Sequence, residues 1–375
     1  MKVDVITLHN VSNYGSCLQA YATQTLFKQL GCEVEIIDYY RKDILPEVQI
    51  EHAFNGHALG RFHYLWEKAP WLKELLSYPI GGMLEARRRP FEEFRQQYLN
   101  LTRPYTSADQ LVDDPPSADI YCTGSDQVWN SIWNQGFDDA FYLGFAPEGK
   151  KRIAFSASIG RDVLDEWEIP LMKEALSKYQ AISLREISGI KLLDDLGFPE
   201  VRLVLDPTLM LTRDNWISLS TMPASISKPY LLVYQLNDDS RFDEYVVSMR
   251  RRYGLDVVKV SYLTHDCKNY AKNVVAPAVT DFLGLLLNAS YVVTDSFHAT
   301  AFSLNCGMPF TSIAPARFST RIKSVLELTE QQDRLLTDIN DVEMFERPVD
   351  FRLAQDKLQE MREKSLTFLE SAIAD

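Results

Sequence analysis

The first forty residues alternate between strand-like apolar runs and a helical apolar stripe. Residues 3–8 (VDVITL) and 33–39 (EVEIIDY) are short β-rich runs. Between them, residues 18–30 carry a helical stripe made of Leu18, Tyr21, Ala22, Leu26 and Leu30. Gly31 then stands where the C-terminal cap of a helix is expected. This order predicts a β-α-β unit, which opens a parallel sheet covered by helices.

The strand pattern lapses over residues 46–105 and then returns. Four further apolar runs, typical of buried strands, lie at 119–124, 152–158, 181–185 and 201–206. Helical stretches separate the later runs, the clearest at 186–196 with Gly197 as its stop. Strands that alternate with helices again predict a parallel sheet. Residues 46–105 are therefore predicted to form an insertion within the part of the chain that builds this first sheet.

A second alternating series follows a stretch rich in serine and proline at 219–229, which predicts a domain boundary. The expected strands are 230–236, 256–261, 291–295 and 311–314, and the expected helices are 240–253, 280–288 and one from about 297. Residues 352–374 form a last amphipathic helix.

The chain is thus predicted to be an α/β protein of two Rossmann-like lobes with a cleft between them. The N-terminal lobe spans 1–222 with the insertion 46–105, and the C-terminal lobe spans 223–345. Residues 346–375 form a C-terminal helix that we expect to pack back on the N-terminal lobe. In open parallel sheets, ligands bind at the carboxyl ends of the strands, so the cleft is the expected site.

Composition narrows the class of protein. The 375 residues carry a net charge of −13, which disfavours general nucleic-acid binding because phosphate backbones repel an acidic surface. The five cysteines form no CxxC pair, and this dispersed odd number indicates reduced cytoplasmic thiols, with no metal site expected. No apolar run approaches the about 18 residues of a membrane span. We expect a cytoplasmic globular protein.

The strongest chemical signal lies at residues 291–309 (YVVTDSFHATAFSLNCGMP). A buried strand ends at Asp295, Ser296 can cap the next helix, and Phe297 and His298 fall in its first turn. Free N–H groups and the helix dipole attract anions there, so His298 is expected to bind a phosphate or carboxylate or to deliver a proton. Packing at a strand–helix junction is the alternative.

Cations follow two other expected strands. Arg185 stands directly after a strand, where a guanidinium can hold a carboxylate or phosphate by two hydrogen bonds; a surface ion pair with Glu186 or Asp194 is the alternative. Arg317, Arg321 and Lys323 come just beyond the strand that follows the His298 helix. An anionic small molecule would explain this cluster in an acidic protein, and a solvated basic face is the alternative.

Two polar loops suit a sugar. Asn13, Tyr14 and Gly15 join the first strand to its helix, without the GxGxxG of a dinucleotide site. Ser125, Asp126 and Gln127 follow the strand at 119–124, and Asp126 could serve as a base. Plain turn chemistry explains the first loop equally well, and an aspartate that caps a helix explains the second. The aromatic segment 61–76 either touches a membrane surface or packs over the cleft.

Six segments in this order resemble the polysaccharide pyruvyl transferase family: ITLHNVSNYGSCLQAYA, CTGSDQVWN, AFSASIG, ISLRE, LVLDPTLML and TDSFHATAFSLNCGMPF. The likeness runs from Val3 to about Leu336. It implies a two-lobed glycosyltransferase-B-type fold. It also implies transfer of a pyruvyl group from phosphoenolpyruvate to a hydroxyl pair of a surface-polysaccharide precursor, forming a cyclic ketal and releasing phosphate.

The resemblance also implies site residues. A family arginine matches Arg185, and the family's Arg-Leu-His motif falls on Ser296, Phe297 and His298, so Ser296 replaces an arginine expected to hold the donor. Arg317 or Arg321 would then supply that charge, unless the donor differs. The catalytic set expected is His298, Arg185 and Asp126. The donor set is completed by Ser296, Phe297, Arg317 and Arg321, and the acceptor set is Asn13, Tyr14, Gly15, Ser125 and Gln127.

No cofactor is expected besides phosphoenolpyruvate as donor substrate. The acceptor would be a saccharide or a lipid-linked saccharide, with peripheral contact at the inner face of the membrane. Two alternatives stay open: a glycosyltransferase that uses a nucleotide sugar, and a non-catalytic glycan-binding relative that lost donor binding through Ser296.

Overall fold

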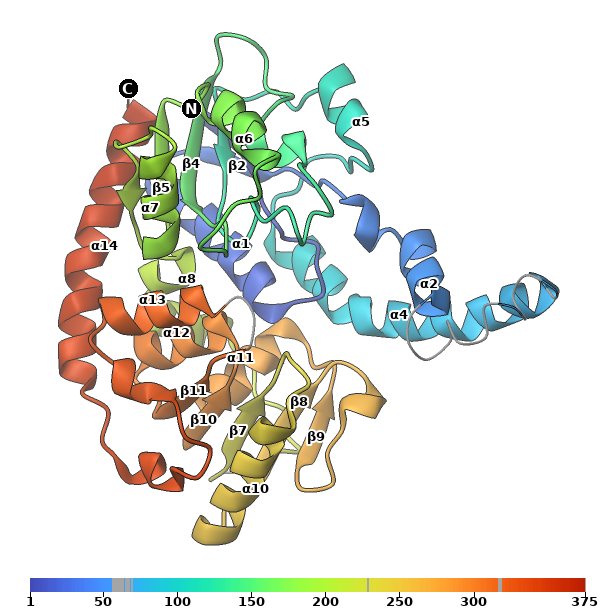
Figure 1. Cartoon of the computed structure of the whole chain (residues 1–375), viewed down its shortest axis with the longest axis vertical. Coiled ribbons are helices and arrows are strands. Elements are labelled where there is room, and N and C mark those ends of the chain that lie inside the picture. The colour runs from blue at the N-terminus through green and yellow to red at the C-terminus, as the bar shows by residue number, and fades with distance from the viewer. Residues whose placement is uncertain (56–63, 65–67, 69, 228, 316–318, 375) are drawn as a thin grey trace.

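The computed structural model describes residues 1–55, 64, 68, 70–227, 229–315 and 319–374, and it contains two parallel sheets (Figure 1). The first sheet has the strand order β2-β1-β3-β4-β5-β6. Its strands are β1 (Lys2–Ile6), β2 (Glu33–Ile36), β3 (Ile120–Thr123), β4 (Lys151–Ala157), β5 (Ala181–Leu184) and β6 (Arg202–Leu203). Each neighbouring pair runs parallel.

The second sheet has the order β12-β11-β10-β7-β8-β9, and its neighbouring strands are again parallel. Its strands are β7 (Leu231–Tyr234), β8 (Val257–Ser261), β9 (Lys272–Val275), β10 (Tyr291–Thr294), β11 (Phe310–Ile313) and β12 (Leu335–Leu336). The prediction of two Rossmann-like lobes is confirmed. The edge strands β9 and β12 were not predicted, because they are short and only partly buried.

Helices connect the strands and cover the sheets. In the first lobe they are α1 (Tyr14–Gln29), α5 (Ala108–Asp113), α6 (Glu168–Leu176), α7 (Ile187–Asp195), α8 (Pro207–Met210) and α9 (Arg213–Leu219). In the second lobe they are α10 (Ser240–Tyr253), α11 (Val279–Leu287), α12 (Phe297–Cys306) and α13 (Thr320–Leu328). Helix α1 begins four residues before the predicted start, because the Asn13 side chain accepts a hydrogen bond from the Ser16 N–H and caps it there.

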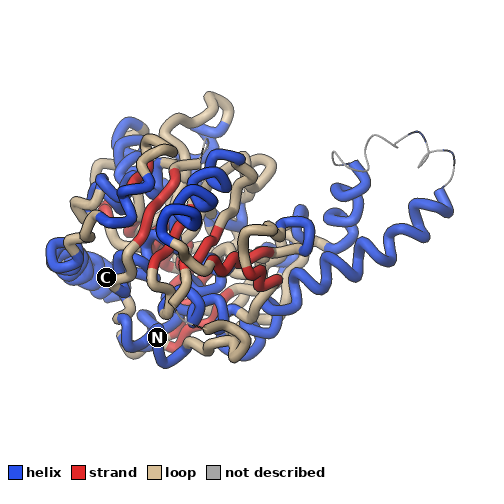
Figure 2. Tube along the Cα trace, turned by 90° about the horizontal axis from the view of Figure 1, so that it is seen from below, coloured by secondary structure: helices blue, strands red, loops and turns tan. Residues whose placement is uncertain are grey.

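The predicted insertion forms an arm that projects from the body (Figures 1 and 2). We call α2 (Pro46–Asn55) and α4 (Pro70–Tyr98) together the arm. The first half of α4 contacts α2, where Lys73 pairs with Glu51. The last turns of α4 return to the body, where Phe91 and Phe94 join the main core. The arm therefore has one end in solvent and the other beside the junction of the lobes.

The largest apolar core crosses between the lobes. Trp216 of α9 packs edge-on against Phe302 of α12, with ring centroids 4.9 Å apart. The last helix, α14 (Phe351–Ala374), lies along both lobes (Figure 1). Its Ser365 hydroxyl accepts a hydrogen bond from the Leu205 N–H, and its Gln355 amide donates one to the Leu304 carbonyl. These contacts hold the two sheets with their carboxyl ends facing one cavity.

No described helix is both long and apolar enough to cross a membrane.

Candidate active site between the lobes

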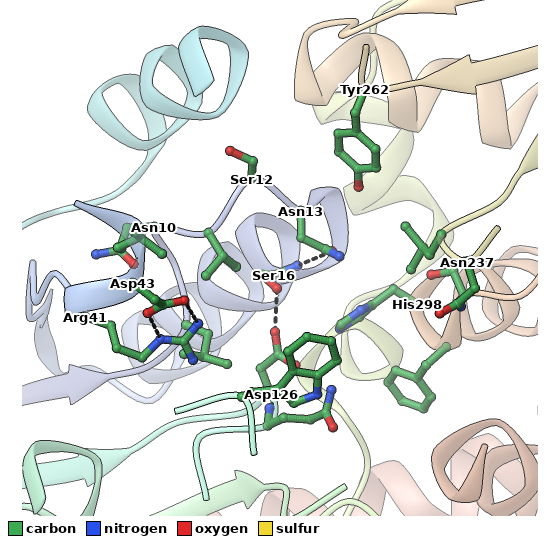
Figure 3. A pocket seen from close by; sticks show the side chains of 18 of the residues that line it. Asn10, Ser12, Asn13, Ser16, Arg41, Asp43, Asp126, Asn237, Tyr262 and His298 are labelled. Carbon is green, nitrogen blue, oxygen red and sulfur yellow. Dashed lines mark hydrogen bonds and ion pairs between the residues drawn. The ribbon is translucent and has the colours of Figure 1, made fainter. Parts of the chain in front are cut away.

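A cavity of about 460 Å³ lies where the loops after β1, β3, β8, β10 and β11 meet the last turns of α4 (Figure 3). Its volume is that of a small-molecule site. Figure 3 shows His298 on one side of Asp126 and Ser16, and the Arg41–Asp43 pair on the other. The residues that line the cavity include Asn10, Asn13, Ser16, Arg41, Asp43, Arg87, Arg88, Asp126, Gln127, Trp133, Asn237, Tyr262, Asp295, Ser296, Phe297, His298 and Arg321.

His298 lies in the first turn of α12, as predicted, and faces the cavity. The Ser296 side chain caps this helix by accepting a hydrogen bond from the Ala299 N–H. The imidazole is only 6% exposed, and its buried Nε2 has no hydrogen-bond partner among the described residues. The nearest carboxylate oxygen, Oδ2 of Asp206, is 3.9 Å away. A buried, unpartnered nitrogen on a cavity wall is typical of a ligand-binding position.

The electrostatic surroundings keep His298 neutral at neutral pH. Burial lowers the pKa of the imidazole to about 4, although the carboxylates of Asp206 and Asp126 partly oppose this effect. A bound anion would favour the protonated form and raise this pKa. The site can therefore couple binding of an anion to uptake of a proton.

Gly15 permits the close approach of His298 to α1. A Cβ atom at position 15 would lie 2.1 Å from Nδ1 of His298, far inside van der Waals contact. Gly15 was predicted to contact the acceptor through its loop. The structure gives it a steric reason to be glycine, which is to leave room for the imidazole.

Arg185 is held in a buried ionic network by its two terminal nitrogens, although its Nε has no hydrogen-bond partner among the described residues. Its Nη1 donates to Asp206 at 2.6 Å and to the Ser125 hydroxyl at 3.1 Å, and its Nη2 donates to Asp126 at 3.1 Å. The cavity-lining residues, as far as the chain is described, do not include Arg185. The guanidinium lies behind the wall that Asp126 forms, so the geometry supports a positioning role more than donor contact.

Asp126 is a carboxylate with both oxygens occupied. Oδ2 accepts a hydrogen bond from the Ser16 hydroxyl, and Oδ1 accepts from the Gln127 N–H at 2.8 Å and from Arg185. Burial alone would raise the pKa of Asp126, but the charge of Arg185, the charge that His298 carries once it is protonated at acidic pH, and the Ser16 hydrogen bond hold this pKa below its usual value. Its backbone has a φ of 76°, which is strained for a non-glycine residue. These features suit a fixed negative charge better than a base.

Arg321 supplies a cation without a carboxylate partner. It is the second residue of α13, lines the cavity, and makes no ion pair with any described residue. Its guanidinium carbon lies 5.8 Å from the centre of the Phe297 ring, whose other neighbour is Arg185 at 4.7 Å. Burial, together with the charge of Arg185, lowers the pKa of Arg321 to about 10, so it is still a cation at neutral pH. The predicted residue Arg317 lies outside the described residues.

The predicted acceptor residues separate into two groups. Asn13 and Gln127 line the cavity. Tyr14 is buried between the lobes, where its ring stacks on Phe282 at 4.2 Å and its hydroxyl donates to the Pro277 carbonyl. Ser125 is buried in the Arg185 network. Direct contact of Tyr14 or Ser125 with a sugar has no support from this geometry.

Sequence reasoning missed other lining residues. Arg41 forms a two-pronged ion pair with Asp43 on the lobe-one side of the cavity. Arg87 and Arg88 come from the arm, and the run of three arginines at 87–89 was the only signal that could have pointed to them. Their position could not be predicted because a helix from an insertion has no fixed place relative to the sheet.

Asp295 marks the lobe-two side. Its carboxylate accepts hydrogen bonds from the backbone N–H groups of Leu236 and Asn237, at 2.7 and 2.9 Å. These contacts tie the end of β10 to the end of β7 beside His298. Among the described residues there is no cluster of histidine, cysteine and acidic side chains that could hold a metal ion.

Structural comparison places the fold among enzymes that act on nucleotide sugars. UDP-N-acetylglucosamine 2-epimerase of Methanocaldococcus jannaschii, in complex with UDP-GlcNAc and UDP, superposes with a TM-score of 0.51 at 13% identity. The alignment covers 96% of this chain and 94% of the epimerase. MnaA of S. aureus with UDP gives a TM-score of 0.50 at 11% identity, covering 92% of this chain and 86% of MnaA. At these identities the likeness shows the glycosyltransferase-B-type fold alone.

A comparison with curated proteins finds no match. The family comparison is decisive: the profile named polysaccharide pyruvyl transferase matches residues 13–317, which include α1, the Asp126 loop, Arg185 and the His298 turn. The chain therefore belongs to the polysaccharide pyruvyl transferase family.

Proposed function

We propose that the cavity binds phosphoenolpyruvate and transfers its pyruvyl group to a hydroxyl pair of a saccharide. The observation that carries this proposal is that one cavity is lined both by His298, whose Nε2 has no partner among the described residues, and by Arg321, which makes no ion pair with them. A helix N-terminus, a guanidinium and an imidazole together suit a small molecule with phosphate and carboxylate groups. Arg321 would take the place of the family arginine that Ser296 replaces.

The reaction requires one proton donor and a set of cationic or N–H groups that binds the phosphate. A proton added to the methylene carbon of the donor makes its central carbon electron-poor, and a sugar hydroxyl forms a bond to that carbon. The second hydroxyl then bonds to the same carbon as the bond between that carbon and the bridging phosphate oxygen breaks, and this oxygen leaves with the phosphate. Of the two hydroxyl protons, one balances the proton taken up by the methylene group and the other leaves with the phosphate.

We assign proton delivery to His298. The free imidazole is neutral at pH 7, and the negative charge of the bound donor raises its pKa, so that protonation accompanies donor binding. Arg321 and the first-turn N–H groups of α12 stabilise the phosphate as charge develops on it. Asp126, the weaker catalytic candidate, would hold the Ser16 hydroxyl and the loop at Gln127 in place. Arg185 would act through Asp126 and Asp206 as a positioning residue.

The polar side chains on the lobe-one side suit the acceptor. Asn10, Asn13 and Gln127 offer amide groups on the cavity wall, and Trp133 offers an indole. All four residues belong to the first lobe. Amides and an aromatic ring are the groups that contact hydroxyls and the apolar face of a sugar. We therefore propose a saccharide, free or lipid-linked, as acceptor.

Binding of the donor tests this proposal against the nucleotide-sugar alternative, which the UDP complexes of the two structural neighbours favour. A ligand at 100 times its Kd stabilises the folded protein by about 2.7 kcal/mol. We expect phosphoenolpyruvate to raise the melting temperature and UDP-GlcNAc to leave it unchanged. Stabilisation by UDP-GlcNAc alone would favour a glycosyltransferase, and binding of saccharide without either donor would favour the glycan-binding alternative.

The cellular site is part of the proposal. We propose action in the cytoplasm at the inner face of the membrane, where a lipid-linked precursor would be accessible. All five cysteines are free, which suits a reducing compartment.

Membrane contact would involve the arm. Part of the segment 61–76 lies outside the described residues, but Trp71, Leu75 and Tyr78 follow helical spacing on α4 and are 67%, 59% and 75% exposed. Co-sedimentation with phosphatidylcholine vesicles tests this contact. We expect the triple variant Trp71→Ser/Leu75→Ser/Tyr78→Ser to lose binding to the vesicles. Trp167→Ser, which replaces an exposed tryptophan at α6, should keep this binding.

A further inference from the structure

The cavity is lined by more arginines than the one, Arg321, that is assigned to the donor. Besides Arg321, the arginines Arg87 and Arg88 of α4 line it, and neither forms an ion pair with any described residue. The Nε of Arg87 is buried and has no hydrogen-bond partner in the part of the chain that the structure describes. By contrast Arg89, the next residue, is exposed and pairs with Glu93 four residues on. Two unpaired guanidiniums on a cavity wall call for an anion from the ligand.

These arginines lie at a different end of the cavity from Arg321. The Arg87 guanidinium lies 5.3 Å from the centre of the Tyr262 ring, and Tyr262 directly follows β8. Arg321 lies over Phe297, which follows β10. In the order β10-β7-β8 these strand ends are two spacings apart, or about 10 Å. The cations thus form two groups rather than one cluster.

The cavity also has room beyond that taken by the donor. Phosphoenolpyruvate has about ten non-hydrogen atoms, and at about 30 Å³ for each, the volume of a liquid water molecule, it fills about 300 Å³. This generous figure is well below the 460 Å³ available. A donor at α12 therefore leaves space for about five further non-hydrogen atoms, the number in a phosphate group, beside Tyr262 and the last turns of α4.

We propose that Arg87 and Arg88 form a second anion subsite and that the acceptor saccharide carries an anionic group, a phosphate ester or a carboxylate, which this subsite binds. The inference rests on the proposed function for the identity of the donor. The anionic group enters beside the base of the arm, and the hydroxyl pair then reaches the donor at His298. The insertion thus contributes acceptor recognition as well as a projecting surface.

Calorimetric titration of the enzyme saturated with phosphoenolpyruvate tests this subsite. The probes are glucose 1-phosphate, glucuronate and free glucose, so that phosphate and carboxylate are distinguished. We expect at least one anionic probe to bind at least about tenfold more tightly than glucose, the gain of one charge-assisted hydrogen bond. Arg87→Gln/Arg88→Gln should abolish this difference, whereas Arg89→Gln should preserve it.

Three further measurements keep the outcome interpretable. Affinity for phosphoenolpyruvate should change less than about twofold in the double glutamine variant and fall at least about tenfold in Arg321→Gln. Arg87→Lys/Arg88→Lys should retain part of the preference for the anionic probe, which a merely misfolded variant would not. The melting temperatures of all variants are measured alongside.

The proposal is overturned if no anionic probe binds better than glucose, or if the double glutamine variant loses phosphoenolpyruvate affinity as Arg321→Gln does. Failure of the wild type to bind phosphoenolpyruvate would instead refute the proposed function. The same probes titrated without donor would still decide whether Arg87 and Arg88 bind an anion.

Discussion

Gly15→Ala places a methyl group against the proposed proton donor. The added Cβ would lie 2.1 Å from Nδ1 and 2.2 Å from Cγ of His298, whereas ordinary contact begins near 3.4 Å. The imidazole must therefore move by more than 1 Å. His298 is 6% exposed and borders the cavity, so the ring has room to shift only into the space that the donor would occupy.

Two magnitudes follow from this displacement. A shift of about 1 Å in a catalytic group costs about 100-fold in rate, so kcat should fall by that factor. Overpacking a core position costs about 1–3 kcal/mol of unfolding free energy. Activity is followed as phosphate released from phosphoenolpyruvate in the presence of acceptor, well below the melting temperature of the variant, and stability is followed by urea denaturation.

Gly82→Ala is the matched control. Gly82 lies within α4, and a Cβ there would meet no atom within 4 Å. Alanine is the better helix former, so this variant should gain up to about 1 kcal/mol in stability with unchanged kcat. If Gly15→Ala kept the wild-type kcat, the position of the His298 imidazole would not matter for the reaction, and the proposed role of His298 would be refuted.

The remaining predictions concern buried charge. Arg185→Lys should lower the unfolding free energy by about 3 kcal/mol, because an ammonium cannot hold both Asp126 and Asp206; equal stability in urea would contradict the network. Because burial lowers the pKa of His298 from 6.5 to about 4, the folded state binds fewer protons than the unfolded chain between these values, so stability should fall by about 3 kcal/mol as the pH drops through this window. His298→Gln should flatten that pH dependence, and an unchanged profile would be inconsistent with it. Burial raises the pKa of Asp4, a residue of strand β1, from 3.8 to about 7. Because the unfolded chain ionises Asp4 more readily, this residue lowers the free energy of unfolding as the pH rises through that range. Asp4→Asn should therefore stabilise the protein by up to about 4 kcal/mol at pH 8 and little at pH 4, and a loss of stability at pH 8 would show that the buried carboxylate is satisfied.

Much of the fold could be predicted because the buried strands are continuous apolar runs. The runs that contain β1, β3, β7 and β10 are each bounded by turn residues, and parallel strands buried on both faces need no polar alternation. The arm could not be predicted in the same way. Pro79 and Pro90 stand inside α4, and proline inside an apolar pattern argues against a continuous helix.

The sequence could predict which site residues follow strands and meet at one edge of a sheet. It could not predict which groups their side chains contact. His298 and Asp126 follow buried strands, so their convergence at one edge follows from topology. Whether a charge faces the cavity or a buried counter-ion depends on tertiary packing, which separates Arg321 from Arg185 although both follow strands. Tyr14 illustrates the same limit, because its ring turns into the interlobe core rather than toward the cavity.

The most direct test of the donor assignment follows the pyruvyl carbons themselves. Enzyme is incubated with phosphoenolpyruvate labelled with carbon-13 in the pyruvyl group and with candidate saccharides, and the products are analysed by mass spectrometry beside a phosphate assay. We expect a labelled pyruvyl ketal on one saccharide, one phosphate released for each ketal formed, and neither product with His298→Ala. Phosphate released without labelled saccharide, or label transferred at the wild-type rate by His298→Ala, would contradict the account.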